Sequence, residues 1–75
     1  MAEGIVVQKN SRESIVIKET NYNGHELIDI RTFYKGENDE LLPTKKGVTF
    51  KADKLENFIA SLSSLSQEIT MRGDA

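Results

Sequence analysis

The sequence predicts an α+β fold in which a four-stranded antiparallel sheet is followed by one C-terminal amphipathic helix. Short apolar segments rich in β-branched residues occur within residues 5–50, and turn residues separate them. After residue 53 the apolar residues recur at helical spacing instead. The connections between the predicted strands are short, which favours antiparallel neighbours. We assign residues 1–70 to one domain and expect residues 71–75 to form a disordered tail.

The first two predicted strands are residues 5–7 (IVV) and 15–17 (IVI), which are β-branched throughout. Asn10 belongs to a turn signal between them. Further along, Asn23 and Gly24 form a pair that favours the positive φ of a tight reversal. The second strand is therefore expected to lead directly into a hairpin with the third.

The third predicted strand, residues 27–34 (LIDIRTFY), is the strongest of the four. Residues 35–40 are a polar turn, and residues 48–50 (VTF) alternate as a fourth strand. Pro43 has no backbone N–H to donate, so it fits an edge strand or a strand start. Because side chains alternate along a strand, one face of the third strand carries Ile28, Ile30 and Thr32, and the other carries Leu27, Asp29, Arg31 and Phe33.

A helix of about 15 residues is predicted after the sheet. Asp53 and Glu56, three residues apart, form an N-terminal capping pattern in which Asp53 accepts from free backbone amides. Gly73 is a C-terminal stop signal. The apolar stripe of this helix consists of Leu55, Phe58, Ile59, Leu62, Leu65 and Ile69.

The stripe is longer than one face of a small sheet needs, and the chain has few other means of stabilising itself. It has 75 residues, no Cys for disulfides and one His, too few ligands for a structural zinc site. Either Ile69 caps the core of a monomer, or the helix is shared across a homodimer. We expect the homodimer, with an interface formed by Phe58, Leu62, Leu65 and Ile69.

Composition and charge exclude several classes of protein. The longest uninterrupted apolar run has three residues, whereas a membrane-spanning helix needs about 20. Residues 1–4 lack the basic region and long apolar core of a secretory signal, so we expect a cytoplasmic protein with no membrane partner. The net charge of −2 counts against non-specific binding to duplex DNA.

The sequence also lacks the groupings of residues that catalysis needs. Nucleophilic catalysis needs a base beside a nucleophile, and metal catalysis needs clustered ligands. His25 follows the predicted hairpin turn, where a solvent-exposed side chain is expected. A small enzyme with His25 as its base is the weakest interpretation, so we predict a protein that is not an enzyme and holds no cofactor or metal.

Basic and aromatic residues alternate in the sheet half of the chain in a way that suits single-stranded nucleic acid. Exposed bases stack on aromatic rings such as those of Tyr22, Phe33 and Tyr34, while Lys and Arg follow the phosphates. The alternative is that the aromatic residues belong to the core and that Lys45 and Lys46 only protect a solvated sheet edge. The pattern alone leaves both interpretations open.

Two segments of the chain carry a resemblance to a known family: residues 27–34 (LIDIRTFY) and residues 43–48 (PTKKGV). Together, at a spacing that needs no gap, they resemble the C-terminal domain of the transcriptional coactivator family called positive cofactor four, or p15. The likeness covers roughly residues 15–65. It implies a homodimer whose helices pack together and whose two curved sheets bind single-stranded or melted DNA with little sequence preference. The chain looks like a compact, stand-alone bacterial or phage-like member.

The resemblance also implies which side chains contact the phosphates. Arg31 corresponds to the family's phosphate-contacting strand arginine, and Lys45 and Lys46 correspond to its basic pair. Lys18 is the expected basic residue of the preceding strand. All four cations would neutralise the DNA backbone, so affinity should fall steeply with salt.

Two tyrosines correspond to the family's base-stacking aromatics. Tyr34 matches the first, and Tyr22 matches the second without a gap, although a longer turn would align Thr20 instead. Strict alternation places Arg31 and Tyr34 on opposite faces, so both can serve one DNA path only if the strand twists sharply or carries a bulge after Arg31. Otherwise Tyr34 belongs to the core.

From these observations we predict a homodimeric, sequence-nonspecific single-stranded DNA-binding protein that assists transcription, replication or repair. Its partners would be single-stranded DNA, a second copy of itself and, through a coactivator role, the transcription machinery. RNA is a further candidate ligand, and in a bacterium the protein would be nucleoid-associated. The alternative is a small dimeric protein-interaction module without nucleic-acid binding, which would use Phe33, Leu41 and Leu42 as an apolar patch.

Overall fold

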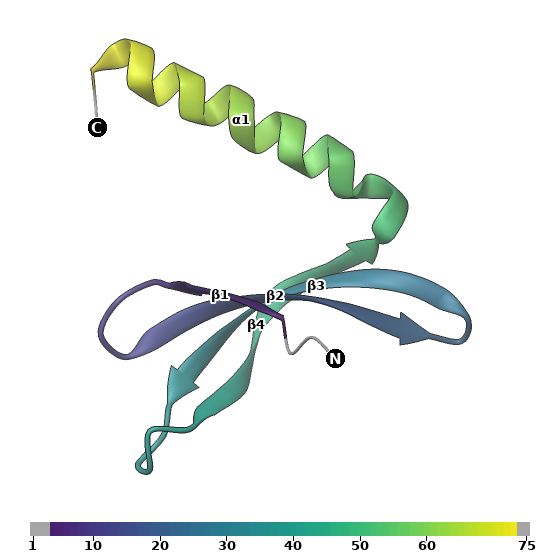
Figure 1. Cartoon of the computed structure of the whole chain (residues 1–75), viewed down its shortest axis with the longest axis vertical. Helices are drawn as coiled ribbons and strands as arrows, with labels where there is room; N and C mark the ends of the chain where they lie inside the picture. Colours follow the sequence, from purple (N-terminus) through teal and green to yellow (C-terminus); the bar gives the residue numbers. More distant parts are fainter. Residues whose placement is uncertain (1–3, 74–75) are drawn as a thin grey trace.

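The computed structural model describes residues 4–73, and Figure 1 shows a single sheet with a long helix beside it. The sheet contains four antiparallel strands in the order β1-β2-β3-β4, which confirms the predicted α+β class. In chain order the elements are β1 (Ile5–Gln8), β2 (Glu13–Tyr22), β3 (His25–Lys35), β4 (Leu41–Lys51), the 3-10 turn η1 (Ala52–Lys54) and the helix α1 (Leu55–Arg72).

The central hairpin of β2 and β3 is regular along its whole length. Its pairing continues without a break from Glu13 opposite Tyr34 to Tyr22 opposite His25. Asn23 and Gly24 connect the strands with φ angles of 53° and 82°, the positive values that a two-residue hairpin turn requires. This confirms the hairpin expected at the Asn-Gly pair. Both strands are longer than predicted, because ladder hydrogen bonds include polar residues as readily as apolar ones.

The pairing of β3 with β4 changes register in its middle. Arg31 lies opposite Gly47 and Phe33 opposite Pro43, so a single β3 residue, Thr32, faces three residues of β4, numbers 44–46. This irregularity is a β-bulge on the edge strand β4, which we call the β4 bulge. A bulge after Arg31 was one condition under which Arg31 and Tyr34 could serve one DNA path, and the pairing does change there. The extra residues, however, belong to β4, and β3 itself runs straight against β2.

Alternation and register assign the side chains of the sheet to two faces. The Arg31 face carries Lys18, Asp29, Arg31 and Phe33, and the Ile28 face carries Ile28, Ile30, Tyr34 and Phe50. Among the described residues the buried hydrophobic side chains are Val16 and Ile28, one on each face. The sheet therefore has a small core and leaves much of both faces open.

The helix begins later than its capping pattern predicted. Residues 52–54 form the 3-10 turn η1, the N-cap of α1 is Lys54, and no side chain makes a capping hydrogen bond at either start. The prediction that Asp53 accepts from the free amides is therefore wrong. Asp53 lies inside η1, where its own backbone is already helical. Asp53 and Glu56 still place negative charge at the positive end of the helix dipole.

The helix ends as predicted at Gly73, which has a φ of 81° and donates its N–H to the carbonyls of Ile69 and Thr70. It has 18 residues, so it is slightly longer than expected. Met71 and Arg72, the first residues of the expected disordered tail, are helical. The last part of that expected tail, residues 74–75, lies outside the described residues, as do residues 1–3.

The apolar stripe of α1 is not covered by the sheet. Figure 1 shows that α1 lies apart from the sheet along most of its length. The ring of Phe58 stacks on Phe50 with the ring centroids 4.1 Å apart, which attaches the start of the helix to the Ile28 face. No residue of α1 is buried, and Leu62 is 61% exposed. This observation does not support a monomer core capped by Ile69. Among the described residues, no helix has the length and apolar character needed to cross a membrane.

We predict that Gly47→Ala destabilises the protein, because regular pairing between β3 and β4 resumes at this glycine, opposite Arg31. A Cβ at position 47 would lie 2.7 Å from the carbonyl oxygen of Ile30 and 3.0 Å from the Cα of Arg31. Both contacts belong to β3, so its backbone and that of β4 must move apart. Overpacking of this kind costs about 1–3 kcal/mol. Urea unfolding measures the change. Lys46→Ala is the control, with a shift within about 0.5 kcal/mol, and an equally stable Gly47→Ala would contradict the prediction.

Candidate nucleic-acid interface

The predicted phosphate-binding residues lie on three neighbouring strands, β2, β3 and the bulged part of β4. Lys18 lies opposite Asp29 on the Arg31 face, and Arg31 is the next residue of β3 on the same face. Lys45 and Lys46 are exposed residues of the bulge itself, beside Arg31 and opposite Thr32. The four predicted cations are thus brought to one region of the sheet.

The two predicted stacking residues are not brought together. Tyr22, at the hairpin end of β2, is on the Arg31 face and 67% exposed. Tyr34 is on the Ile28 face, because β3 has no bulge of its own that would turn it over. It is nevertheless 44% exposed and lines an open hollow with Arg12 and Lys35, so it is not a core residue.

Phe33 was named both among the aromatic residues that could stack on bases and in the alternative protein-binding patch, but not among the committed binding residues. It shares a face with Arg31, and Tyr34 does not. Phe33 is partly buried and follows Asp29 and Arg31 at strand spacing on β3. The signal that identifies it is the same alternation that separated Arg31 from Tyr34. An aromatic side chain beside the β4 bulge is therefore available from Phe33.

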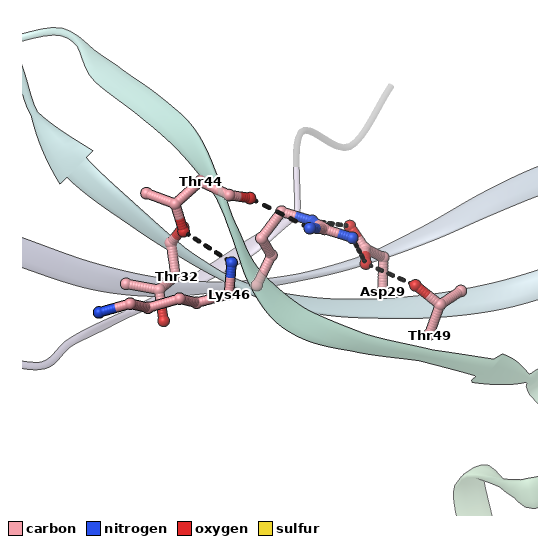
Figure 2. Close-up of polar contacts among 6 residues, drawn as sticks. Asp29, Thr32, Thr44, Lys46 and Thr49 are labelled. Atoms are coloured by element: carbon pink, nitrogen blue, oxygen red, sulfur yellow. Dashed lines mark hydrogen bonds and ion pairs between the residues drawn. The ribbon is translucent and has the colours of Figure 1, made fainter.

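Arg31 is held by a network of polar contacts, and Figure 2 labels the other residues of this network, among them Asp29, Thr44 and Thr49. Its Nε donates to Oδ2 of Asp29 at 3.1 Å, and its Nη2 donates to Oδ1 at 3.0 Å, a two-pronged ion pair. The hydroxyl of Thr49 on β4 donates to the same Oδ1 at 2.9 Å. Asp29 is only 8% exposed, so this carboxylate lies inside the sheet surface and is fully engaged there.

Arg31 also connects this network to the β4 bulge. Its Nη1 donates to the backbone carbonyl of Thr44 at 3.1 Å. The Thr44 hydroxyl donates to the carbonyl of Thr32 at 2.7 Å and accepts from the backbone N–H of Lys46 at 3.1 Å. Figure 2 shows the hydrogen bond between Thr44 and Lys46. The backbone of the bulge is thus fixed by hydrogen bonds at both ends.

The charged groups of the site differ in whether they have a partner within the protein. The Arg31 guanidinium, as hydrogen-bond donor, lowers the pKa of Asp29, and Asp29 in turn raises the pKa of Arg31. Between residues 4 and 73, the ammonium groups of Lys18, Lys45 and Lys46 make no hydrogen bond or ion pair with the protein. Lys18 and Lys46 act on the carboxylates of Asp29 and Glu13 only through longer-range attraction, which helps to lower the pKa of each. The three ammonium groups can therefore contact an anionic ligand, whereas the charge of Arg31 is largely neutralised by Asp29.

These features define a class of protein. Its members are small α+β proteins in which an antiparallel sheet is followed by a C-terminal helix and an edge strand carries exposed lysines, here Lys45 and Lys46 of β4. The sequence model of the family described as transcriptional coactivator p15 (PC4) matches residues 9–61, and the chain belongs to this family. DNA binding and a coactivator-like role in transcription are the functions that the family supports. Among the curated proteins, none matches the chain.

Solved structures agree with this assignment. A PC4 homologue from Burkholderia pseudomallei superposes with a TM-score of 0.81 at 24% identity in its orthorhombic crystal form, over 91% of this chain and 97% of that chain. Its tetragonal form gives a TM-score of 0.75 at 26% identity, over 83% and 91%. The bacteriophage T5 homologue of the eukaryotic coactivator PC4 gives 0.62 at 22% identity, over 95% and 80%. The sheet-and-helix fold is therefore shared with bacterial and phage relatives.

We predict that the Asp29–Arg31 pair stabilises the fold near neutral pH and loses this contribution in acid. The pKa of Asp29 is lowered in the folded state, so its stabilisation is complete above the ordinary Asp pKa of about 4 and is lost as pH falls further. Asp29→Asn should cost about 1–3 kcal/mol at pH 7. Urea unfolding at pH 7, 5 and 3 measures the free energy of unfolding of the wild-type protein and of Asp29→Asn. A difference between them that stays constant down to pH 3 would contradict the prediction.

Proposed function

We propose that the protein is a homodimeric single-stranded DNA-binding protein with little sequence preference. The observation that carries the proposal is a set of three lysines without a hydrogen bond or ion pair among the described residues: Lys45 and Lys46 on the β4 bulge, and Lys18 on β2 opposite Asp29. Lysine ammonium groups act as point charges that attract phosphate without reading base identity. A strand crossing this part of the sheet would be bound mainly through its backbone.

Stacking would supply the preference for single strands over duplex. Bases are accessible to aromatic rings only where they are not paired, and each stacked base contributes about 1–3 kcal/mol. Tyr22 and Tyr34 have exposed rings, and Phe33 adds a third ring on the Arg31 face. Tyr22 lies near the hairpin tip and Phe33 near the bulge, so a strand along β2 and β3 would meet both on one face.

The second copy of the chain would cover the apolar surface that α1 leaves open. Leu62, Leu65 and the partly covered Phe58 face away from any buried core. Ile5 and Val7 add exposed apolar surface on the Ile28 face of β1. Exposed apolar area of this extent on a small protein is typical of an interface. The dimer would then present two Arg31 faces, one from each copy.

The cellular process that we propose is the use of single-stranded DNA in transcription or replication. The family's coactivator role supports the first. The phage T5 homologue is implicated in recombination-dependent DNA replication, which supports the second. Such a protein would act at the DNA in the cytoplasm, and at the nucleoid of a bacterium. The proposal contains no catalytic step, and His25 is exposed at the hairpin tip.

We predict that Leu62→Glu dissociates the homodimer. A carboxylate at this position would have to be buried without a partner in an apolar interface, which is strongly unfavourable. Leu62 is exposed within one copy, so the variant should still fold. Light scattering after gel filtration measures the mass, and Ser63→Glu is the control with the same charge change. A Leu62→Glu protein of unchanged dimeric mass would contradict the predicted interface.

We predict tight, salt-sensitive binding of labelled oligo-thymidine and much weaker binding of the annealed duplex, measured by fluorescence anisotropy at several salt concentrations. Replacing both Lys45 and Lys46 by Ala should lower the slope of log K against log salt by about 1.4, because each single-strand phosphate contact contributes about 0.7.

The control for this double variant is Lys9→Ala, because Lys9 is already paired with Glu13 at 3.5 Å. Its salt slope should equal that of the wild type. Absence of oligo-thymidine binding by the wild-type protein would sink the proposed function. Equal binding by the double variant would move the site away from the β4 bulge. Adding oligo-uridine as a competitor compares RNA with DNA in the same assay.

A further inference from the structure

Asp29 is a negative charge placed inside a surface that we propose binds a polyanion, and this location requires an explanation. It lies on the Arg31 face with Lys18 directly opposite on β2. A carboxylate there repels phosphate unless its charge is cancelled locally. Asp29 is also buried, which carries a desolvation cost that only well-formed hydrogen bonds offset. A residue of this kind is expected to have a structural task.

The contacts identify that task as fixing Arg31. The carboxylate occupies the Nε and Nη2 donors of the guanidinium, and Thr49 holds Oδ1 from the neighbouring strand. The guanidinium is planar and rigid, so fixing one edge also fixes the direction of its Nη1 group. That group donates to the carbonyl of Thr44, the first of the three residues opposite Thr32.

Thr44 transmits this restraint to the lysines. Its hydroxyl donates to the Thr32 carbonyl of β3 and accepts from the Lys46 backbone N–H. Thr44 therefore connects the bulge both to β3 and to the backbone of Lys46. Gly47 then brings β4 into close contact with Ile30 and Arg31 of β3. Residues 45 and 46 lie between these two fixed points, and their exposed side chains extend from a backbone that the network holds.

We propose that Asp29 is a positioning residue for DNA binding, which acts through Arg31 and Thr44 to fix the β4 bulge and thereby the directions of Lys45 and Lys46. This inference rests on the proposed single-stranded DNA-binding function. It assigns to Arg31 a second task besides any phosphate contact, namely the connection between the carboxylate and the bulge. Preorganised cations lose less conformational entropy on binding, which increases affinity.

The decisive experiment is Asp29→Asn, because simple electrostatics and positioning predict opposite signs. Removing a negative charge beside the site, with Arg31 released, should raise affinity for oligo-thymidine if Asp29 only repels phosphate. If Asp29 positions the bulge, affinity falls about tenfold, and the salt slope falls by about 0.7 for each phosphate that the lysines no longer reach. Glu26→Gln is the control, since Glu26 is exposed and its carboxylate has no partner in the described residues.

A second pair of variants leaves the charge unchanged. Thr44→Val removes both hydroxyl hydrogen bonds and should reproduce the decrease in affinity and slope, whereas Thr44→Ser keeps the hydroxyl and should restore both. Hydrogen exchange of the Lys46 amide, which donates to Thr44, provides a readout without DNA. It should accelerate in Asp29→Asn and in Thr44→Val but not in Thr44→Ser. If Asp29→Asn does not fold, the Thr44 variants carry the test.

The outcomes separate this inference from the proposed function. If the wild-type protein binds oligo-thymidine and folded Asp29→Asn binds equally or more tightly, the positioning inference is overturned and the function stands. Unchanged exchange of the Lys46 amide in Thr44→Val also overturns it. If the wild-type protein does not bind oligo-thymidine, both the proposed function and the positioning inference fail. Weaker binding and faster exchange in both variants support the inference.

Discussion

The structure depends on one constraint, which is that a four-stranded sheet has two faces and this chain supplies one helix that covers neither of them. The helix is attached through the stacked rings of Phe50 and Phe58 and then leaves the sheet. Within residues 4–73 the buried hydrophobic core is limited to Val16 and Ile28. Stability must therefore come from the β2–β3 ladder, the polar network around Asp29 and, in our proposal, a second copy of the chain.

Most of the fold could be predicted from the sequence, because the strongest signals are local. The turn at Asn23 and Gly24 and the helix end at Gly73 each depend on a backbone conformation that these residues favour. The helix start was placed wrongly at Asp53, because a 3-10 turn and an N-cap share the same acidic residues. The full length of β4 was also missed, since Pro43 and two lysines conceal a strand whose ladder is interrupted by a bulge.

The candidate site was only partly predictable, because part of it depends on register between strands. A bulge after Arg31 was considered only as a condition for Tyr34 to share the DNA path of Arg31, and alternation correctly separated the two side chains. Alternation could not show that the extra residues lie in β4, since this depends on which β4 residue faces Thr32. The contacts of Asp29 were missed for the same reason. An Asp two residues before an Arg on one strand is a visible signal, but Thr44 and Thr49 join it only through long-range pairing.

The network also explains why the polar surface would bind DNA without reading sequence. An arginine free to present its two-pronged edge can recognise guanine, as arginines do in duplex grooves. Here that edge of Arg31 is occupied by Asp29, and its Nη1 is bonded to Thr44. The charges left for a ligand belong to lysines, which have no planar edge to match a base. In the proposed function, this acidic residue would direct recognition towards phosphates and leave the bases to non-specific stacking.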